Sequence, residues 1–275
     1  MSTPDTDAAS PDEPRAEVRL ERVDLPAGDD GGPERAIAVM VFDHEARRNA
    51  MTLEMWQTVP ELCAEIEADP TIRVVVLRGA GERAFVAGAD ISQFTEQRSG
   101  EGAGRYDEAT AAAYGAIEHL SKPVLACVHG FCVGGGLAIS LQADVRYAAD
   151  DARFALPPAK LGIGYNAAGI RQLSTLVGPA VAKELVYTAD LYDAPTALRW
   201  GLVNHVLPKA ELDDHVMARA ALMAERAPLS QRAAKLAIAD DPEAETVIDQ
   251  CFTSADYAEG VAAFLEKRPP RFTCS

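Results

Sequence analysis

The amino-acid sequence predicts an α/β fold with a mostly helical C-terminal region, and three observations support this prediction. Apolar, β-branched runs alternate with helical patterns over the middle of the chain. Two of these runs end in glycine-containing turns that open helix-like segments, FVAGADI at 85–91 and GFCVGGGLA at 130–138. From residue 167 onward the pattern is mostly helical. With 275 residues, the chain is long enough to bury a substantial core.

Composition argues against several classes of protein. A formal net charge of -16 disfavours nonspecific binding to nucleic acids and to anionic membranes. The hydrophobic fraction of 48% is ordinary for a globular protein, and no apolar run reaches the roughly 18 residues that a membrane span needs. The N-terminus has no basic segment followed by an apolar one. We therefore expect a cytoplasmic protein that is neither secreted nor inserted in a membrane.

The cysteines predict reduced thiols rather than a disulfide framework. They are odd in number and lack paired motifs: Cys63, Cys127, Cys132, Cys251 and Cys274. No cluster of His, Cys or carboxylate residues has the spacing of metal ligands, so no metal site is predicted. His129 and Cys132 flank the triple glycine, and we interpret both as residues of the core.

The N-terminal part of the chain is expected to begin with a disordered acidic tail. Residues 1–17 are rich in Ser, Thr, Pro, Asp and Ala, and they offer almost no large apolar side chain whose burial could offset the entropy of ordering. Strands are predicted at 18–25 and 36–42, as an antiparallel pair around a turn at 28–33. Thr52 is placed to cap a helix that runs to about residue 69.

The middle of the chain alternates between strands and helices. The predicted strands cover 71–77, 84–87, 124–128, 144–148 and 153–155. Residues 92–106 are predicted as a loop, 107–120 as a helix and 156–166 as irregular structure. Asp90 and Asp144 are predicted to cap or brace adjacent helix ends.

The C-terminal part is predicted to be helical, with one strand at 202–207. The predicted helices cover 167–176, 179–188, 194–200, 211–226, 229–239, 244–252 and 257–267. The last of them ends before Pro269 and Pro270, which cannot continue a helix. Apolar faces on the final helices predict contacts between subunits.

The triple glycine, Gly134 to Gly136, has two possible roles when its residues are considered alone. Without Cβ atoms, it lets another group approach the backbone closely, and N–H groups at a helix start attract negative charge. The alternative is a turn whose glycines serve tight packing. Arg47 and Arg48 are likewise open to interpretation as solvated surface charges or as partners of an anionic ligand.

Four segments, taken in order, resemble the crotonase family, also called the enoyl-CoA hydratase and isomerase family. They are FVAGADI at 85–91, GFCVGGGLA at 130–138, GLVNHVLP at 201–208 and AFLEKRPPRF at 263–272. The resemblance runs from about residue 18 to residue 272. It implies a ClpP-like spiral of repeated strand-strand-helix units over 18–208, and a helical region at 209–275 that forms trimers or dimers of trimers.

The resemblance also implies an acyl-CoA thioester as substrate, with no separate cofactor. The family's oxyanion hole, two backbone N–H groups that hold the thioester oxygen, matches Ala89 and Gly135. Such donors stabilise an enolate oxygen as its charge develops. The matching CoA-binding positions are Arg48, Ala50, Ala87, Gly88, Ala89, Asp90, Ile91, Phe264 and Lys267, the last two often supplied by a neighbouring subunit.

The sequence departs from the hydratase pattern at two positions. Hydratases of the family use two glutamates to activate water and move its protons. The matching residues here are Ala138, after the triple glycine, and Pro158, in the segment LPPAKLG. Neither side chain transfers a proton, so hydration by two glutamates is not expected.

The segment LGIGYNAAGI at 161–170 offers other polar groups for the acyl end of the site. It resembles the corresponding segment of the family's methylmalonyl-CoA decarboxylases, and it supplies Tyr165 and Asn166 as candidate catalytic residues. Three functions remain open: enolate chemistry in the family's general sense, decarboxylation of a malonyl-type thioester, and noncatalytic acyl-CoA binding. A dinucleotide-binding fold is not favoured, because GxxxGGG is not the GxGxxG fingerprint.

Overall fold

The structure is a computed structural model that describes residues 16–26, 34–90 and 101–273, with the side chains of 101–103 not described. Most of the predicted tail, 1–17, lies outside these ranges. Its last residue is already part of a strand, because β1 spans Glu17–Leu25. None of the described helices is long and apolar enough to cross a membrane.

A six-stranded sheet forms the centre of the molecule, in the order β1-β2-β3-β5-β7-β10. Strands β1 and β2 (Arg35–Asp43) pair antiparallel, as predicted. The other neighbours pair in parallel. These strands are β3 (Ile72–Gly79), β5 (Val124–Val128), β7 (Val145–Ala149) and β10 (His205–Leu207).

A second sheet has four short strands in the order β4-β6-β8-β9. They are β4 (Ala84–Val86), β6 (Phe131–Val133), β8 (Arg153–Ala155) and β9 (Tyr192–Asp193). The chain therefore passes three times from a strand of the first sheet to one of the second, and then to a helix. At one of these corners Gly130 has φ 52°, and an added Cβ would lie 2.0 Å from the carbonyl oxygen of Arg83. Only glycine fits such a corner.

The helices of the N-terminal two thirds mostly follow the prediction. They are α1 (Leu53–Ala68), α3 (Glu101–Glu118), α4 (Gly135–Leu141), α5 (Pro158–Leu161), α6 (Ala167–Val177), α7 (Pro179–Thr188) and α8 (Ala194–Arg199). Thr52 caps α1 by accepting a hydrogen bond from the Met55 N–H at 3.2 Å. The predicted loop at 92–106 is wrong over its last six residues, which begin α3, and the segment predicted as irregular contains α5.

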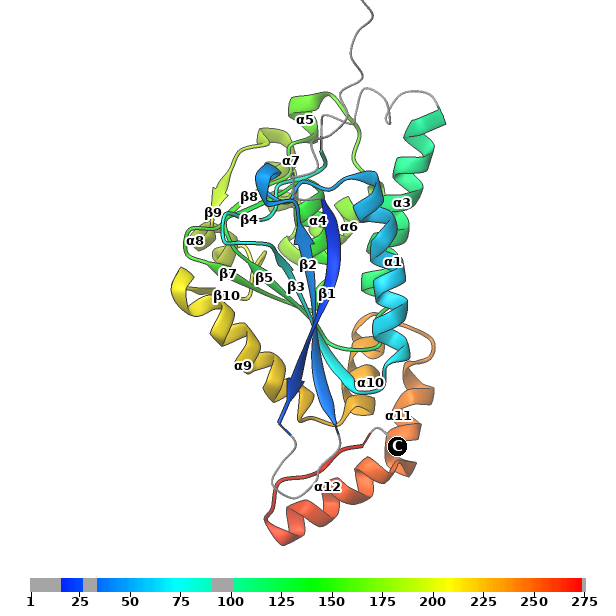
Figure 1. The fold of residues 1–275 in the computed structure, drawn as a ribbon. Helices are drawn as coiled ribbons and strands as arrows, with labels where there is room; N and C mark the ends of the chain where they lie inside the picture. Colours follow the sequence, from blue (N-terminus) through cyan, green and yellow to red (C-terminus); the bar gives the residue numbers. More distant parts are fainter. Residues whose placement is uncertain (1–15, 27–33, 91–100, 274–275) are drawn as a thin grey trace, which may run out of the picture.

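Alternation along the strands builds two cores, one on each face of the large sheet. In β2, Met40 and Phe42 belong to the core that α1 and α3 cover, whereas Val39 and Val41 belong to the core under α9 (Leu212–Ala224). Figure 1 shows α9 on one side of the sheet and α1 and α3 on the other. A short 3-10 helix, η3 (Lys209–Glu211), leads into α9.

Asp144 does not cap its helix, contrary to the prediction. Its carboxylate accepts a hydrogen bond of 2.7 Å from the Val124 N–H and pairs with Lys235 at 3.2 Å. Asp144 therefore ties the start of β5 to the C-terminal helix α10 (Pro228–Ile238).

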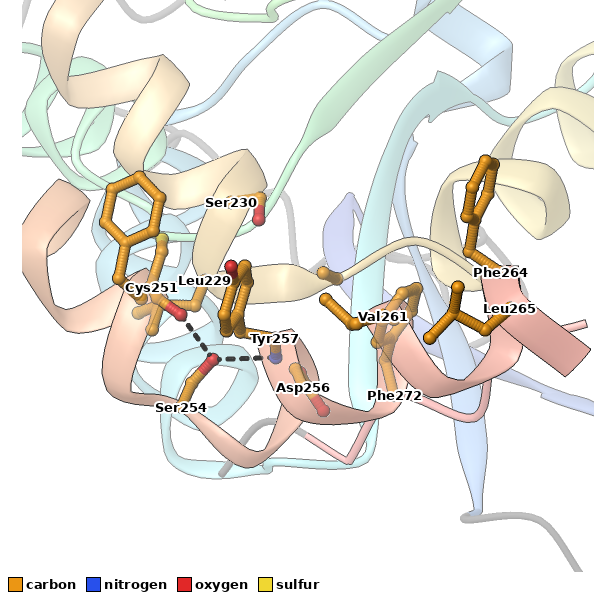
Figure 2. A pocket seen from close by; sticks show the side chains of 13 residues that line it. Leu229, Ser230, Cys251, Ser254, Asp256, Tyr257, Val261, Phe264, Leu265 and Phe272 are labelled. Atoms are coloured by element: carbon orange, nitrogen blue, oxygen red, sulfur yellow. Dashed lines mark hydrogen bonds between the residues drawn. The ribbon is translucent and has the colours of Figure 1, made fainter.

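The last helices, α11 (Ala244–Thr253) and α12 (Ala255–Glu266), lie at the opposite end of the molecule from α4 and α5 (Figure 1). They expose large apolar side chains: Phe264 is 83% exposed, Leu265 74% and Phe252 63%. Figure 2 shows the shallow hollow of about 510 Å³ that these side chains line together with Tyr257 and Val261. Within a single chain, this apolar surface remains open to solvent.

Candidate active site

The first glycine turn is held in place by the segment that precedes α1. Ala87 N–H donates to the Arg48 carbonyl at 3.0 Å, and Asp90 N–H donates to the Met51 carbonyl at 2.9 Å. Between them, the Gly88 carbonyl accepts from Met51 N–H at 2.9 Å. Within the described part of the chain, Ala89 N–H donates to no backbone acceptor. The turn is therefore rigid while the predicted donor stays available.

A buried amide positions this preceding segment. Asn49 is 1% exposed, and its side-chain NH₂ donates to the carbonyls of Ala80 and Ala84 at 3.0 and 2.9 Å. Its side-chain oxygen accepts from His44 N–H at 3.1 Å. Asn49 thus clamps the loop to the corner between β3 and β4. The sequence analysis missed this role, because a single Asn in a polar loop gives no sign of burial.

The second glycine turn lies directly against the first. A Cβ on Gly136 would lie 2.0 Å from the Val86 carbonyl oxygen, and one on Gly134 would lie 3.9 Å from Gly88 Cα. Gly134 caps α4, so Gly135 is the first residue of that helix, where N–H groups have no intrahelical acceptor. The structure thus places the two predicted oxyanion-hole residues, Ala89 and Gly135, on adjoining turns.

Aromatic side chains from α1 and α3 surround Gly135. A Cβ added to Gly135 would lie 3.1 Å from the Trp56 ring and 3.7 Å from the Tyr114 hydroxyl. Trp56 is fixed in place, because its Nε1–H donates to the Tyr106 hydroxyl at 2.8 Å. None of these three residues is recognisable as part of the site from the sequence, since aromatic residues on helices are most often core residues.

Tyr165 lies beside the same turn, and Asn166 follows it in the sequence. The Tyr165 hydroxyl donates to the Gly134 carbonyl at 3.4 Å, a weak bond. Asn166 is exposed and caps α6: its side-chain oxygen accepts from the N–H groups of Ala168 and Gly169 at 2.7 and 3.4 Å. Because its side-chain oxygen is engaged in this cap, Asn166 would contact a ligand through its NH₂ group.

The two positions that depart from the hydratase pattern are both buried. Ala138 is 3% exposed in α4, and Pro158 is the buried first residue of α5. Neither Ala138 nor Pro158 contributes a side chain that can take up or release a proton. Cys132, one residue before Val133 at the end of β6, is fully buried, and burial raises the pKa of its thiol to about 12. It is a core residue, as the sequence analysis interpreted it.

The predicted CoA-binding residues form one group near the glycine turns and a second group far from them. Arg48 lies over the Phe131 ring at 4.7 Å from its centroid, and Ala50, two residues further along the chain, is buried. Asp90 is 9% exposed and pairs with Arg47 at 3.1 Å. Ile91 lies outside the described residues.

Phe264 and Lys267 belong to the second group, at the end of α12. Lys267 caps this helix in a left-handed conformation, with φ 56°. Because α12 lies at the opposite end of the molecule from α4, one chain does not bring these two residues to the glycine turns (Figure 1).

One cluster of potential metal ligands, Cys127, His129 and Asp213, forms among the described residues. Their ligand atoms all lie within 4.8 Å of one another, although Asp213 is distant in sequence. Sequence spacing alone did not reveal this cluster, and the expectation that the chain holds no metal stays a prediction. Asp213 accepts from His129 Nε2 at 3.0 Å and from the Cys127 thiol at 3.2 Å, and it pairs with Arg78 at 3.4 Å. Burial, together with the nearby Asp213 carboxylate, raises the pKa of the Cys127 thiol.

Comparison with known proteins decides the family. A family model described as enoyl-CoA hydratase/isomerase matches residues 32–274. The chain belongs to the enoyl-CoA hydratase/isomerase family. It is therefore an acyl-CoA enzyme of that family, and the resemblance drawn from the four sequence motifs is confirmed.

Two relatives carry hydratase names. The short-chain-enoyl-CoA hydratase of Clostridium acetobutylicum is 35% identical over 244 residues, covering 86% of this chain and 93% of that protein. The crotonyl-CoA hydratase of Syntrophomonas wolfei is 34% identical over 250 residues, covering 87% and 95%. The comparisons thus lend no support to the prediction against hydration.

Solved structures of the same family share the fold. An enoyl-CoA hydratase/carnithine racemase from Magnetospirillum magneticum superimposes with a TM-score of 0.83 at 38% identity, covering 88% of this chain and 94% of that one. A putative family member from Hyphomonas neptunium gives 0.84 at 34% identity, covering 94% and 98%. The predicted crotonase spiral is confirmed.

Proposed function

We propose that this acyl-CoA enzyme holds the thioester oxygen of its substrate between the N–H groups of Ala89 and Gly135, and that it interconverts a short-chain enoyl-CoA and its 3-hydroxyacyl-CoA. The observation that carries the proposal is the close approach of the two glycine turns around Gly134 and Gly88. The names of the two relatives support the choice of reaction.

The protons of this reaction must be moved by groups other than two glutamates. Ala138 and Pro158 are not ionisable, and Tyr165 lies beside the Gly134 carbonyl. We assign Tyr165 as a proton-carrying group and the Asn166 NH₂ as an orienting donor. A phenol both donates and accepts hydrogen bonds, which suits it to hold a water molecule near the substrate.

CoA binding is proposed to use both groups of predicted residues. Arg48 supplies positive charge near the turns, and Ala50 with the segment 87–91 lines the adenine pocket. Phe264 and Lys267 then close over the nucleotide from a neighbouring chain. The exposed apolar face of α12 supports this arrangement, because apolar patches of this kind are covered by partners in stable assemblies. A homotrimer or a dimer of trimers is the expected state.

A second candidate function is decarboxylation of a malonyl-type thioester. The alanine at position 138 and the proline at position 158 favour it, because loss of CO₂ leaves an enolate that the oxyanion hole can hold without a dedicated base. A noncatalytic acyl-CoA-binding protein would show thioester binding without turnover of either substrate class.

The test compares two variants at Gly135. Gly135→Pro removes the N–H at the first helical position, where proline is tolerated. Gly135→Ala keeps the N–H but adds the Cβ that meets Trp56. We expect the proline variant to lose about 100- to 1,000-fold in kcat on crotonyl-CoA relative to the alanine variant.

The same assay separates the candidates. Hydration of crotonyl-CoA, measured as a loss of enoyl absorbance, supports the first function. Release of CO₂ from methylmalonyl-CoA supports the second. Equal rates in the proline and alanine variants would show that the Gly135 N–H holds no oxyanion. Failure of the wild-type protein to bind any CoA thioester in calorimetry would refute the whole proposal.

A further inference from the structure

We propose that the hydroxyl of Tyr114 is a specificity-determining group, which hydrogen-bonds an oxygen carried by the β-carbon of the acyl chain. The inference rests on the proposed oxyanion hole, and it assigns to Tyr114 a role that neither the sequence motifs nor the names of the relatives supply. The inference starts from the position beside Gly135 that a Cβ atom would occupy in any other residue.

Two aromatic side chains lie close to this position. A Cβ there would lie 3.1 and 3.4 Å from two carbons of the Trp56 ring, and 3.7 Å from the Tyr114 hydroxyl oxygen. Apart from the backbone of α4 and its neighbours, the Tyr114 oxygen is the closest polar atom to this point among the described residues. A carbonyl oxygen bound to the Gly135 N–H lies about 3 Å from that nitrogen. The acyl carbons attached to this carbonyl therefore come within reach of the phenol.

Packing holds the Tyr114 ring in position. It meets Trp56 edge to face, with ring centroids 5.3 Å apart and an interplanar angle of 80°. Trp56 is 1% exposed and donates its indole N–H to the buried Tyr106 hydroxyl. The ring of Tyr114 is half-buried and packs against the main core. A phenol fixed in this way loses little entropy when it binds a substrate oxygen.

The three phenols near the turn differ in what they do. The Tyr106 hydroxyl serves Trp56, and the Tyr165 hydroxyl reaches the Gly134 carbonyl on the other flank of the turn. Tyr114 is the one whose oxygen lies within 4 Å of the Gly135 position. It comes from α3, whereas Tyr165 precedes α6, so the two phenols approach the turn from different elements.

The chemistry of this position favours an acyl group with a β-oxygen. Tyr114 is neutral, and its hydroxyl can donate to a keto oxygen or accept from a hydroxyl group. An analogue that lacks this oxygen forfeits one hydrogen bond to the phenol, so it is expected to bind more weakly than a ligand that carries the oxygen. The buried Ala138 near the turn offers no competing polar group.

The experiment uses two ligands of equal chain length, acetoacetyl-CoA and butyryl-CoA. Neither carries a double bond or a β-leaving group, so hydration does not disturb the measurement. Calorimetry is expected to show tighter binding of acetoacetyl-CoA by the wild-type protein. Equal affinities of the wild-type protein for the two ligands would overturn the inference without the need for any variant.

The matched variants are Tyr114→Phe and Tyr187→Phe. Phenylalanine keeps the edge-to-face contact with Trp56, and Tyr187 is 72% exposed on α7. Tyr114→Phe is expected to weaken acetoacetyl-CoA binding about tenfold and leave butyryl-CoA binding within a factor of two. Tyr187→Phe is expected to change neither.

The outcomes distinguish this inference from the function on which it rests. Binding of both ligands with no selective loss in Tyr114→Phe refutes the role of Tyr114 and leaves the oxyanion hole intact. Failure of the wild-type protein to bind either ligand refutes both. A selective loss in Tyr114→Phe with an unchanged thermal midpoint supports the assignment of Tyr114 to the substrate.

Discussion

The two glycine turns and the apolar face of α12 differ in how their surfaces are covered. At the glycine turns, segments of one chain pack closely: a Cβ on Gly136 would collide with the Val86 carbonyl, and one on Gly135 would meet Trp56 and Tyr114. On α12, Phe264 and Leu265 are more than 70% exposed, and the same chain covers neither. Both turns proposed to hold the thioester come from one chain. The residues proposed to close over the nucleotide lie far from these turns, so under the proposal a second chain would supply them.

The largest effect is expected from crowding the turns. Gly136→Ala places a Cβ 2.0 Å from the Val86 carbonyl oxygen, and backbone atoms cannot move aside cheaply. We expect a loss of about 3 kcal/mol in the free energy of unfolding, measured by urea denaturation. Gly104→Ala is the control, because its Cβ meets nothing within 4 Å and alanine favours a helix. Similar stabilities for the two variants would contradict the close packing of α4 on β4.

A smaller effect is expected at the open end of the molecule. If Lys267 binds a CoA phosphate, Lys267→Gln removes one charge-assisted hydrogen bond, and the KM for an acyl-CoA should rise about tenfold. The KM for the corresponding acyl-pantetheine, which lacks the nucleotide, should not change. Lys183→Gln, at an exposed position of α7, is the control. An equal rise for both thioesters would place Lys267 outside the nucleotide contact.

The smallest effect concerns Asp213, which is partly exposed at the start of α9. Hydrogen bonding from His129 lowers the pKa of Asp213 to about 2, against the opposing effect of burial. A lowered carboxyl pKa adds stability above its unfolded value near 4, and this stability disappears as the pH falls from about 4 to 2. Because the side chain is 38% exposed, solvent screening reduces the contribution to about 1 kcal/mol.

Asp213→Asn tests this contribution. It should lower the free energy of unfolding by about 1 kcal/mol at pH 7 and by nothing measurable at pH 2. Between about pH 4 and pH 2, the free energy of unfolding of the variant should therefore fall less steeply than that of the wild-type protein. Asp214→Asn, one residue along the same helix, is a control with no assigned partner role. A constant difference between Asp213→Asn and the wild-type protein across this pH range would argue against titration of Asp213.

Local sequence patterns were sufficient for most of the fold. Alternating apolar runs and glycine turns placed nearly all the described strands and helices, because burial and backbone geometry leave periodic signals. Ala89 and Gly135 were named from the family resemblance, because the glycine turns considered alone left tight packing as an alternative. The start of α3 was missed, since Gly102, Gly104 and nearby charges are typical of loops.

Side-chain partners from distant segments could not be predicted in this way. Tyr114 approaches Gly135, and Asp213 joins Cys127 and His129, only because the two cores fold α3 and α9 onto opposite faces of one sheet. The spacing of residues in the sequence does not predict such contacts between distant segments. The oligomeric state, the reaction within the family and the nucleotide contacts remain predictions.

Strand β1 has a consequence for how copies of the chain associate. It forms one edge of the large sheet, and its outward side chains alternate in charge: Arg19 pairs with Glu21, and Arg22 pairs with Asp24. Charged, ion-paired edges resist the strand-to-strand addition that leads to aggregates. The charged edge of β1 thus disfavours open-ended extension of the sheet, whereas the exposed apolar surface of α12 carries no such barrier to the closed assembly proposed above.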